Sequence, residues 1–437
     1  MSLLSSPKAW QSPATPVVNG RSNETRHRES RIGPFVDDRL RRIVFRRLAN
    51  LSQGRLVLHD HRGRHTFGDV LAEDPSIELH VRDPRFYRRL ALGGSVGAAE
   101  AYFRGHWDCD RLVELLQLFC RETTVSESVE RGLARWTAFA QRFARRLQRN
   151  TLGGSRRNIA AHYDLGEDFF SLFLDETMAY SCGVFPDRLS SLREASLAKF
   201  DRVCRRLQLS DEDHVVEIGS GWGGFAVYAA EEYGCRVTTT TISQRQYEFT
   251  RRRIQEKRLE DRVTVLCQDY RNLTGQFDKL VSIEMIEAVG YEYFDTYFRT
   301  CSELLKPDGM MFLQAITIPD QQFRRYIRSN DPIKHYIFPG GCLPSLGAIF
   351  QSLGRATDMR PVYMEDLTTH YARTLQLWRQ RFRANLDKAP SLGFSEEFLR
   401  LWEFYFCYCE AGFRERKIGE VQLLLRKPRC HHESLLP

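Results

Sequence analysis

The sequence predicts a doubly wound α/β domain with a mostly parallel sheet, preceded by a smaller α+β domain. The central observation is the stretch from Val215 to Gly224, where a short apolar strand runs into a glycine turn and a helix start. Downstream, apolar strand-like runs alternate with amphipathic helical segments, as a parallel sheet requires. Before about residue 150 the pattern differs, and 437 residues are enough for two domains with sizeable cores.

The first part of the chain divides into a tail and the smaller domain. Residues 1–34 are rich in Ser, Pro, Asn and Arg without periodicity, which predicts a disordered basic tail. Residues 35–150 are assigned to a membrane-associated α+β domain. Its expected elements are basic amphipathic helices at 35–48 and 131–149, strands near 55–58, 65–67 and 77–81, and helices at 84–92, 96–104 and 111–120. Each basic helix either attaches to an anionic bilayer or packs on its own domain with a solvated arginine face.

Residues 151–427 are assigned to the larger domain. The expected strands after the glycine turn are 236–241, 263–267, 279–284, 310–317 and 417–425, and the expected helices are 243–258, 291–305, 322–328, 368–388 and 395–415. In this arrangement ligands bind at the carboxyl ends of the strands.

The glycine turn favours a cationic ligand. Gly219, Gly221 and Gly223 carry no side chains, so a ligand can approach the backbone, and the amides of the following helix N-terminus face it. Glu217 precedes the first glycine, giving E-x-G-x-G-x-G in place of the dinucleotide fingerprint G-x-G-x-x-G. A carboxylate there would repel a pyrophosphate but attract the amine and sulfonium of S-adenosylmethionine. The alternative is an ordinary glycine turn between strand and helix.

Residues that end the next strands refine the cofactor. A dinucleotide fold usually has Asp or Glu about 20 residues past the loop, whereas here neutral residues follow, including Thr241, Ile242 and Gln246. Thr241 and Gln246 could bind a ribose or the methionine part of the cofactor, and Asp269 an adenine amino group. Turn and capping roles are the alternative for these side chains.

The composition limits which partners and which cellular compartment are expected. Lys+Arg of 64 against Asp+Glu of 56 gives a net charge of +8, which favours anionic partners such as phospholipid headgroups or nucleic acid. Eleven cysteines without regular spacing indicate reduced thiols. We therefore expect a cytoplasmic protein, peripherally associated with membranes, because no run is long enough to span a bilayer. The oligomeric state, a homodimer included, is open.

Ordered motifs over about 155–425 resemble the cyclopropane-fatty-acyl-phospholipid synthases and their mycolic-acid methyltransferase relatives. They are His162–Gly166, Met178–Cys182, Glu217–Gly224, Thr241–Gln246, Gln268–Arg271, Met285–Gly290, Tyr336–Ser345 and Tyr371–Leu375. Residues 94–112 resemble the smaller N-terminal module of the longer synthases. The resemblance implies a Rossmann-like methyltransferase sheet and methyl transfer from S-adenosylmethionine to a cis double bond of a phospholipid acyl chain, followed by proton loss and ring closure.

The resemblance also implies residue roles. Tyr180 and Ser181 join the cofactor site, and a bound bicarbonate takes the proton. The positions implied to hold bicarbonate are Cys182, Glu287, Gln314, Ile316 and Tyr371. Gln314 departs from the family, where many members have His, and this replaces a titratable group by a neutral amide. The bicarbonate assignment is weakened accordingly.

Alternative functions remain at this stage. A nucleic-acid methyltransferase is compatible with the arginine excess, but no N/D-P-P-Y-type tetrapeptide or zinc ribbon is present, so we expect no nucleic-acid partner. A methyltransferase that leaves a methyl branch, or a non-catalytic lipid-binding protein, would keep the same fold. We also expect no metal, because Cys430-His431-His432 has no second ligand pair nearby in the sequence.

Overall fold

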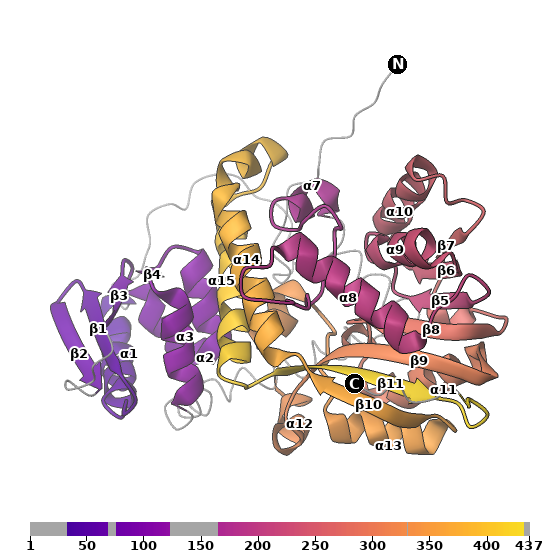
Figure 1. The fold of residues 1–437 in the computed structure, drawn as a ribbon. Coiled ribbons are helices and arrows are strands. Elements are labelled where there is room, and N and C mark those ends of the chain that lie inside the picture. The colour runs from indigo at the N-terminus through magenta and orange to yellow at the C-terminus, as the bar shows by residue number, and fades with distance from the viewer. Residues whose placement is uncertain (1–32, 69–75, 123–164, 330, 432–437) are drawn as a thin grey trace, which may run out of the picture. The chain divides into compact units, whose positions relative to one another are not determined.

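The computed structural model describes residues 33–68, 76–122, 165–329 and 331–431 (Figure 1). They form two compact units. The smaller unit contains the N-terminal residues together with 331–336 and 386–411, and the larger contains most of the rest. The linear boundary expected at residue 150 lies outside the described residues and stays a prediction. The expected domains were each one continuous range, so they did not assign residues 331–336 and 386–411 to the smaller unit.

The larger unit is built on a seven-stranded sheet in the order β10-β11-β9-β8-β5-β6-β7. Its strands are β5 (His214–Ile218), β6 (Arg236–Thr241), β7 (Val263–Cys267), β8 (Phe277–Ile283), β9 (Leu305–Thr317), β10 (Arg360–Asp366) and β11 (Gly419–Arg426). The pairs from β9 to β7 are parallel, whereas β11 is antiparallel to both β9 and β10. The order reverses beside β5, so the glycine loop after β5 lies at the switch point where ligands bind in such sheets.

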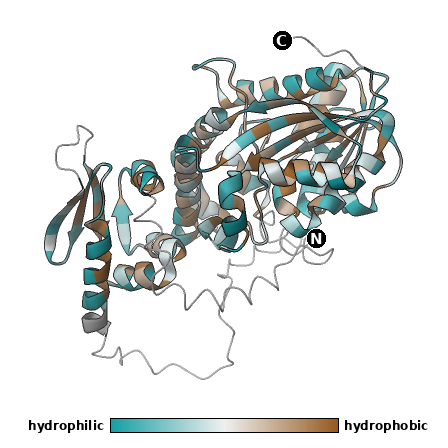
Figure 2. Ribbon diagram, turned by 90° about the horizontal axis from the view of Figure 1, so that it is seen from below, coloured by the Kyte–Doolittle hydropathy of each residue, from teal (hydrophilic) through white to brown (hydrophobic). Residues whose placement is uncertain are grey.

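Helices cover both faces of this sheet, which confirms the doubly wound α/β prediction (Figure 1). The helices are α7 (Gly166–Ser171), α8 (Leu192–Leu207), α9 (Gly224–Tyr233), α10 (Gln244–Glu256), α11 (Phe294–Leu304), α12 (Asp320–Tyr326), α13 (Leu346–Ala356) and α14 (Thr368–Ala384). One apolar cluster joins α11 and α13 to the strands, and another joins α8, α9 and α10 to the opposite face. Strands covered on both faces need apolar residues along their length, and Figure 2 shows hydrophobic segments along the larger sheet.

The smaller unit has a four-stranded sheet in the order β2-β1-β3-β4. Its elements are α1 (Gly33–Leu48), β1 (Arg55–Asp60), β2 (Gly63–Gly68), β3 (Ile77–Val81), α2 (Arg85–Phe103), β4 (Trp107–Cys109), α3 (Leu112–Arg121) and most of α15 (Glu396–Arg414). Phe404, Cys407 and Ala411 of α15 belong to the same apolar core as the N-terminal helices and strands. A helix near the C-terminus of the chain therefore completes the core of the N-terminal module.

The predicted elements agree with the structure where the pattern is strongly periodic. Strands 236–241 and 263–267 have the predicted bounds. The two helices expected at 84–92 and 96–104 are one helix, α2, which is kinked at Gly94 (φ 58°, ψ −138°). The predictions did not include α8, α13 or β10. The helix expected at 131–149 and residues 1–32 of the tail expected at 1–34 lie outside the described residues, whereas Gly33 and Pro34 begin α1.

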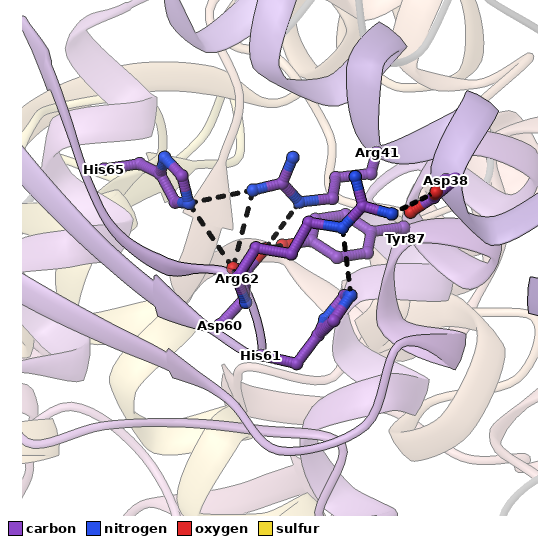
Figure 3. Close-up of polar contacts among 7 residues, drawn as sticks. All are labelled: Asp38, Arg41, Asp60, His61, Arg62, His65 and Tyr87. Carbon is purple, nitrogen blue, oxygen red and sulfur yellow. Dashed lines mark hydrogen bonds and ion pairs between the residues drawn. The ribbon is translucent and has the colours of Figure 1, made fainter.

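Helix α1 is a packed element of its own unit. Leu40, Val44 and Leu48 are buried in the core. On the same helix, the Arg41 guanidinium donates to Asp60 (Nε to Oδ2, 2.6 Å), which also accepts the Tyr87 hydroxyl (2.5 Å), as Figure 3 shows. Burial opposes ionisation of Asp60, but the hydrogen bonds from Arg41 and Tyr87 hold its pKa well below the usual range.

These contacts show what the apolar face of this helix packs against. The apolar face that a bilayer would have to receive is already covered by the core, and Arg41, which is buried on the same face, pairs with Asp60 inside the protein. Attachment through the apolar face of α1 is therefore excluded by its packing. Within the described residues, no helix combines the length and apolar character needed to cross a bilayer.

Candidate active site

The glycine loop joins β5 to α9, and its three glycines have left-handed φ angles of 95°, 49° and 79°. A Cβ on Gly219 would lie 3.1 Å from Met285 Cγ, and one on Gly223 would lie 2.8 Å from Thr250 Cγ2. A Cβ on Gly221 would meet no described atom within 4 Å. Packing therefore requires glycine at 219 and 223, whereas Gly221 borders open space, as the approach of a ligand requires.

Glu217 is buried at the end of β5. Its Oε2 accepts the Thr239 hydroxyl at 2.6 Å. Burial raises the pKa of Glu217 to about 8, against the hydrogen bond from Thr239 and the charge of Lys199. A carboxyl group that is costly to ionise alone becomes easier to ionise beside a bound cation. Its position fits the amine or sulfonium of the expected cofactor.

The ends of β6 and β7 place the remaining predicted cofactor residues. The Thr241 hydroxyl donates to Gln246 Oε1 (2.8 Å) and accepts the Ser243 N–H (3.1 Å), with Ile242 between them in sequence and partly buried. Asp269 caps the short helix Tyr270–Asn272, and its two oxygens accept hydrogen bonds from the Arg271 guanidinium at 2.9 and 2.7 Å. Thr241 and Gln246 form one polar pair, whereas Asp269 shows the capping role that was its alternative. Adenine binding by Asp269 stays a prediction.

Tyr180 and Ser181 lie between an aromatic cluster and a buried cation. Ring centroids lie 5.1–6.5 Å from Tyr180 for four aromatic residues: Phe170, Phe173, Phe338 and Trp378. Ser181 Oγ accepts from Lys199 Nζ at 2.5 Å. Lys199 is fully buried on α8, and burial lowers its pKa, opposed by Glu284, Cys182, Asp175 and Glu420. Tyr180 and its four aromatic neighbours therefore form a largely buried aromatic wall, and the Lys199 ammonium group lies beside it at Ser181.

Three of the residues predicted to be catalytic converge on one carboxylate, that of Glu284. The Cys182 backbone N–H donates to Glu284 Oε1 at 2.7 Å. Gln314 Nε2 donates to the same oxygen at 2.9 Å, and the Tyr371 hydroxyl donates to Oε2 at 2.6 Å. Glu284 was not among the residues predicted from the sequence. It follows β8 directly and precedes Met285, which lies against Gly219 of the glycine loop.

Neighbouring groups fix the orientation of Gln314. Gln314 and Gln422 are partners in the β9–β11 pairing, and Gln422 Nε2 donates to Gln314 Oε1 at 2.9 Å. With its oxygen engaged, Gln314 presents its NH2 group to Glu284. Both glutamines are fully buried, so this amide replaces the histidine of many relatives with a neutral donor that does not titrate.

Glu287 and Ile316 meet beside this centre. Glu287 Oε1 accepts the Ile316 backbone N–H at 2.6 Å, and the buried Oε2 has no hydrogen-bond partner among the described residues. Burial and then the charge of Glu284 raise the pKa of Glu287 to about 8. The fully buried Glu420, also missed by the sequence analysis, has a pKa raised well above its usual value by burial and by Glu284 and Glu287. Three carboxyl groups therefore share the site.

Cys182 contributes through its backbone. Its side chain is fully buried, with Sγ 3.2 Å from the Gly183 carbonyl oxygen. Burial, then the charges of Glu420 and Glu284, raise the pKa of the thiol well above its ordinary value. A thiol held protonated is a poor nucleophile, and the contact of Cys182 with Glu284 is through its backbone N–H.

The residues at this centre do not fit a bicarbonate ion. The donors expected to hold it, the Cys182 N–H, the Gln314 amide and the Tyr371 hydroxyl, all point at the Glu284 carboxylate. An added anion would lie beside the Glu284 carboxylate, whose charge already raises the pKa of Glu287 and of Glu420. Like charges at this range disfavour one another. The three donors expected to hold bicarbonate are therefore already engaged by the Glu284 carboxylate.

The prediction that the chain binds no metal stays a prediction. Among the described residues, His59, Glu78 and His80 of the smaller unit bring three candidate ligand atoms within 4.8 Å of one another.

Comparison with known proteins identifies the family. Residues 151–423 match the family described as mycolic acid cyclopropane synthetase. The chain belongs to this family. It is 38% identical over 389 residues to the tuberculostearic acid methyltransferase UfaA1 of Mycobacterium tuberculosis, which covers 87% of this chain and 90% of that protein. It is 36% identical over 357 residues to the cyclopropane-fatty-acyl-phospholipid synthase of Escherichia coli K12, covering 80% and 88%.

Solved structures agree with the family assignment. The mycolic acid cyclopropane synthase CmaA1, solved with S-adenosylhomocysteine and CTAB, superposes with a TM-score of 0.58 at 31% identity, covering 62% of this chain and 98% of that one. The chain is an S-adenosylmethionine-dependent methyltransferase of the cyclopropane synthase family. The Rossmann-like methyltransferase fold and the suspected family are both confirmed.

Three residues of this site were not predicted from the sequence: Glu284, Glu420 and Lys199. Glu284 was read as the last residue of a strand, and nothing local distinguishes it from an edge charge. The sequence contains a signal for the helix that carries Lys199. Ser191 and Glu194 form the capping box that starts α8, and this pattern is visible in sequence. The capping box would have predicted the helix, but not the burial of its lysine.

Proposed function

We propose that the protein transfers the methyl carbon of S-adenosylmethionine to the cis double bond of an unsaturated phospholipid acyl chain and closes a cyclopropane ring. The observation that carries this is the buried centre at the carboxyl edge of the sheet, where a carboxylate and an aromatic wall lie beside the glycine loop. Met285, next to Glu284, packs on Gly219 and so links the two parts. The synthase of Escherichia coli bears this activity in its name.

The chemistry explains the residue types. The bound sulfonium supplies a methyl group reactive enough for an alkene, which is a weak nucleophile. Methylation leaves a positive charge on the acyl chain, and the aromatic rings around Tyr180 and Trp378 offer it electron-rich faces without water. A base must then remove a proton before water adds. Burial of Tyr371, Gln314 and Cys182 keeps this region dry.

A second product is supported by one observation. The relative UfaA1 is named a tuberculostearic acid methyltransferase, not a cyclopropane synthase. The alternative is therefore methylation of the same acyl chain that leaves a methyl branch. Both products need the same cofactor site and the same lipid, but a saturated methyl branch also needs a hydride from a separate reductant, because proton loss from the carbocation leaves either a ring or a branched chain with a double bond.

Lipid analysis tests the proposal and separates the two products. Cells that express the chain are fed methionine with a trideuterated methyl group, and their fatty acids are analysed by mass spectrometry. We expect a new fatty acid with one added carbon, no double bond at that position and two of the three deuterium atoms, because ring closure removes one. A labelled methyl branch would support the alternative, and unchanged lipids, with the protein folded and expressed, would contradict both.

For attachment to the membrane we propose a basic hollow on α12. Arg324, Arg325 and Arg328, with Gln321 and Ser329, line a surface hollow of about 490 Å³. Helix α12 begins three residues after β9, which carries Gln314 and Ile316, so the arginines follow the carboxyl edge of the sheet. Guanidinium groups suit phosphate oxygens. The occupant proposed is the phosphate of an anionic phospholipid.

Vesicle binding tests the basic hollow. Arginines near an anionic surface contribute about 1 kcal/mol each, and salt screens them beyond roughly 10 Å at 0.1 M. We expect sedimentation with anionic vesicles at low salt, weakened about tenfold or more when Arg324, Arg325 and Arg328 are changed to Gln. The matched control changes three exposed arginines of α8 and α11, Arg193, Arg205 and Arg299, and so removes the same charge. Equal losses in both variants would show general charge attraction and contradict the hollow.

A further inference from the structure

Glu284 has a backbone conformation that glutamate rarely adopts. It has φ 50°, in the left-handed region, where a side chain is disfavoured and glycine is not. Such strain persists when surrounding contacts over-determine the residue, and it clusters at functional sites. Here the contacts are the hydrogen bonds from Cys182, Gln314 and Tyr371. The backbone turn directs the carboxylate to this point.

The Glu284 carboxylate has the shape and charge of the ion that the resemblance placed there. Carboxylate and bicarbonate are planar anions that each present two oxygens to a set of donors. Each of the three groups around Glu284 donates, and a carboxylate is an acceptor. The partners come from distant parts of the chain, 102 residues before and 30 and 87 residues after Glu284. The side chain therefore fills the position of the ion.

Counting lone pairs shows which oxygen remains available. Oε1 accepts two hydrogen bonds, from Cys182 and Gln314. Oε2 accepts one, from the Tyr371 hydroxyl. Each carboxylate oxygen has two acceptor positions, so Oε2 is the less engaged oxygen in these three contacts, and the Glu420 side chain shares a further hydrogen bond with the Glu284 carboxyl group.

We infer that Glu284 is the built-in base of the reaction and makes bicarbonate unnecessary. The inference rests on the proposed function. The alkene electron pair bonds to the methyl carbon as the sulfur–carbon bond breaks and its pair goes to sulfur, leaving a carbocation. Glu284 Oε2 then takes a proton from the transferred methyl carbon. The electron pair of that C–H bond forms the second carbon–carbon bond, so the positive charge of the sulfonium ends as a proton on Glu284.

The first test compares the wild type with and without bicarbonate. In buffer that is boiled and sparged with argon, we expect methylation of phospholipid vesicles at an unchanged rate. Glu284→Gln, which keeps the shape but lacks the base, is expected to lower turnover by about 100-fold or more, with S-adenosylmethionine affinity within about tenfold. Glu303→Gln on α11, an exposed position, is the matched control and should keep full activity. Loss of wild-type activity without bicarbonate, or full activity of Glu284→Gln, would overturn the inference.

The second test uses Glu284→Gly. Glycine relieves the left-handed φ, so the variant should fold, and it exposes the donors of Cys182, Gln314 and Tyr371. We expect this variant to be inactive without bicarbonate and to recover part of its turnover when bicarbonate is added. Line broadening of ¹³C-labelled bicarbonate in NMR should show binding to Glu284→Gly but not to the wild type. Binding to the wild type as strongly as to the variant would contradict the inference.

These measurements separate the inference from the proposed function. The bicarbonate-binding measurement needs no lipid and no turnover, so it reports on the Glu284 site by itself. If the wild type binds S-adenosylmethionine but methylates no phospholipid, the proposed substrate is wrong. The labelled-bicarbonate result then still decides whether Glu284 occupies the anion position.

Discussion

Replacing Gly221 by Val is expected to abolish measurable binding of S-adenosylmethionine while leaving a folded protein. A Cβ at this position meets no described atom within 4 Å, so the branched side chain would project into the space that the cofactor must enter. The left-handed φ of 49° adds some strain, on the order of 1 kcal/mol, which a domain of this size tolerates. Calorimetric titration should show an affinity weakened by at least about 100-fold, or roughly 2.7 kcal/mol.

The matched control for this variant is Gly105→Val. Gly105 also has a left-handed φ, 73°, and no described atom within 4 Å of its would-be Cβ, but it belongs to the smaller unit. It carries the same conformational strain without the proposed ligand. Wild-type affinity in Gly221→Val, or equal losses of affinity in both variants, would remove the glycine loop from the cofactor site.

The second large effect concerns pH and Glu217. Its pKa is raised to about 8 by burial, so at pH 6 the free protein holds a proton that must leave before the carboxylate can pair with the cationic cofactor. Affinity for S-adenosylmethionine should therefore rise with pH, approaching tenfold per unit below about pH 8, and level off above that value. Glu217→Gln should lose this dependence and bind more weakly near and above pH 8, with a difference that shrinks toward pH 6, where Glu217 of the free wild type is protonated.

The test compares the pH dependence of binding in the wild type with that in Glu217→Gln. The amine of the cofactor has its own titration near the same range, and it affects wild type and variant alike. The quantity to plot is the ratio of the two dissociation constants between about pH 6 and pH 8. A ratio that does not change with pH would show that Glu217 does not ionise on binding, and its role would then be hydrogen bonding with Thr239 alone.

Much of the larger unit could be predicted from the sequence because its signals are local. Strands 236–241 and 263–267 are short β-branched or apolar runs between turns, and the observed bounds are the predicted ones. The glycines after β5 indicate a backbone with left-handed φ angles, which glycine alone adopts freely. Strand β10 was missed because it lies at the sheet edge with most residues exposed, so its sequence has no apolar periodicity.

The catalytic centre itself was decided by the tertiary structure. Sequence by itself determined the fold class, the glycine loop and the individual motifs that contain Cys182, Gln314 and Tyr371, because each is a pattern of neighbouring residues. It did not determine that these three donors meet on Glu284, because hydrogen bonds between residues 30 to 102 positions apart depend on how strands and helices pack. Packing also decided what the apolar face of α1 contacts, because its spacing suits a bilayer or a core equally well and only the tertiary structure buries Leu40, Val44 and Leu48.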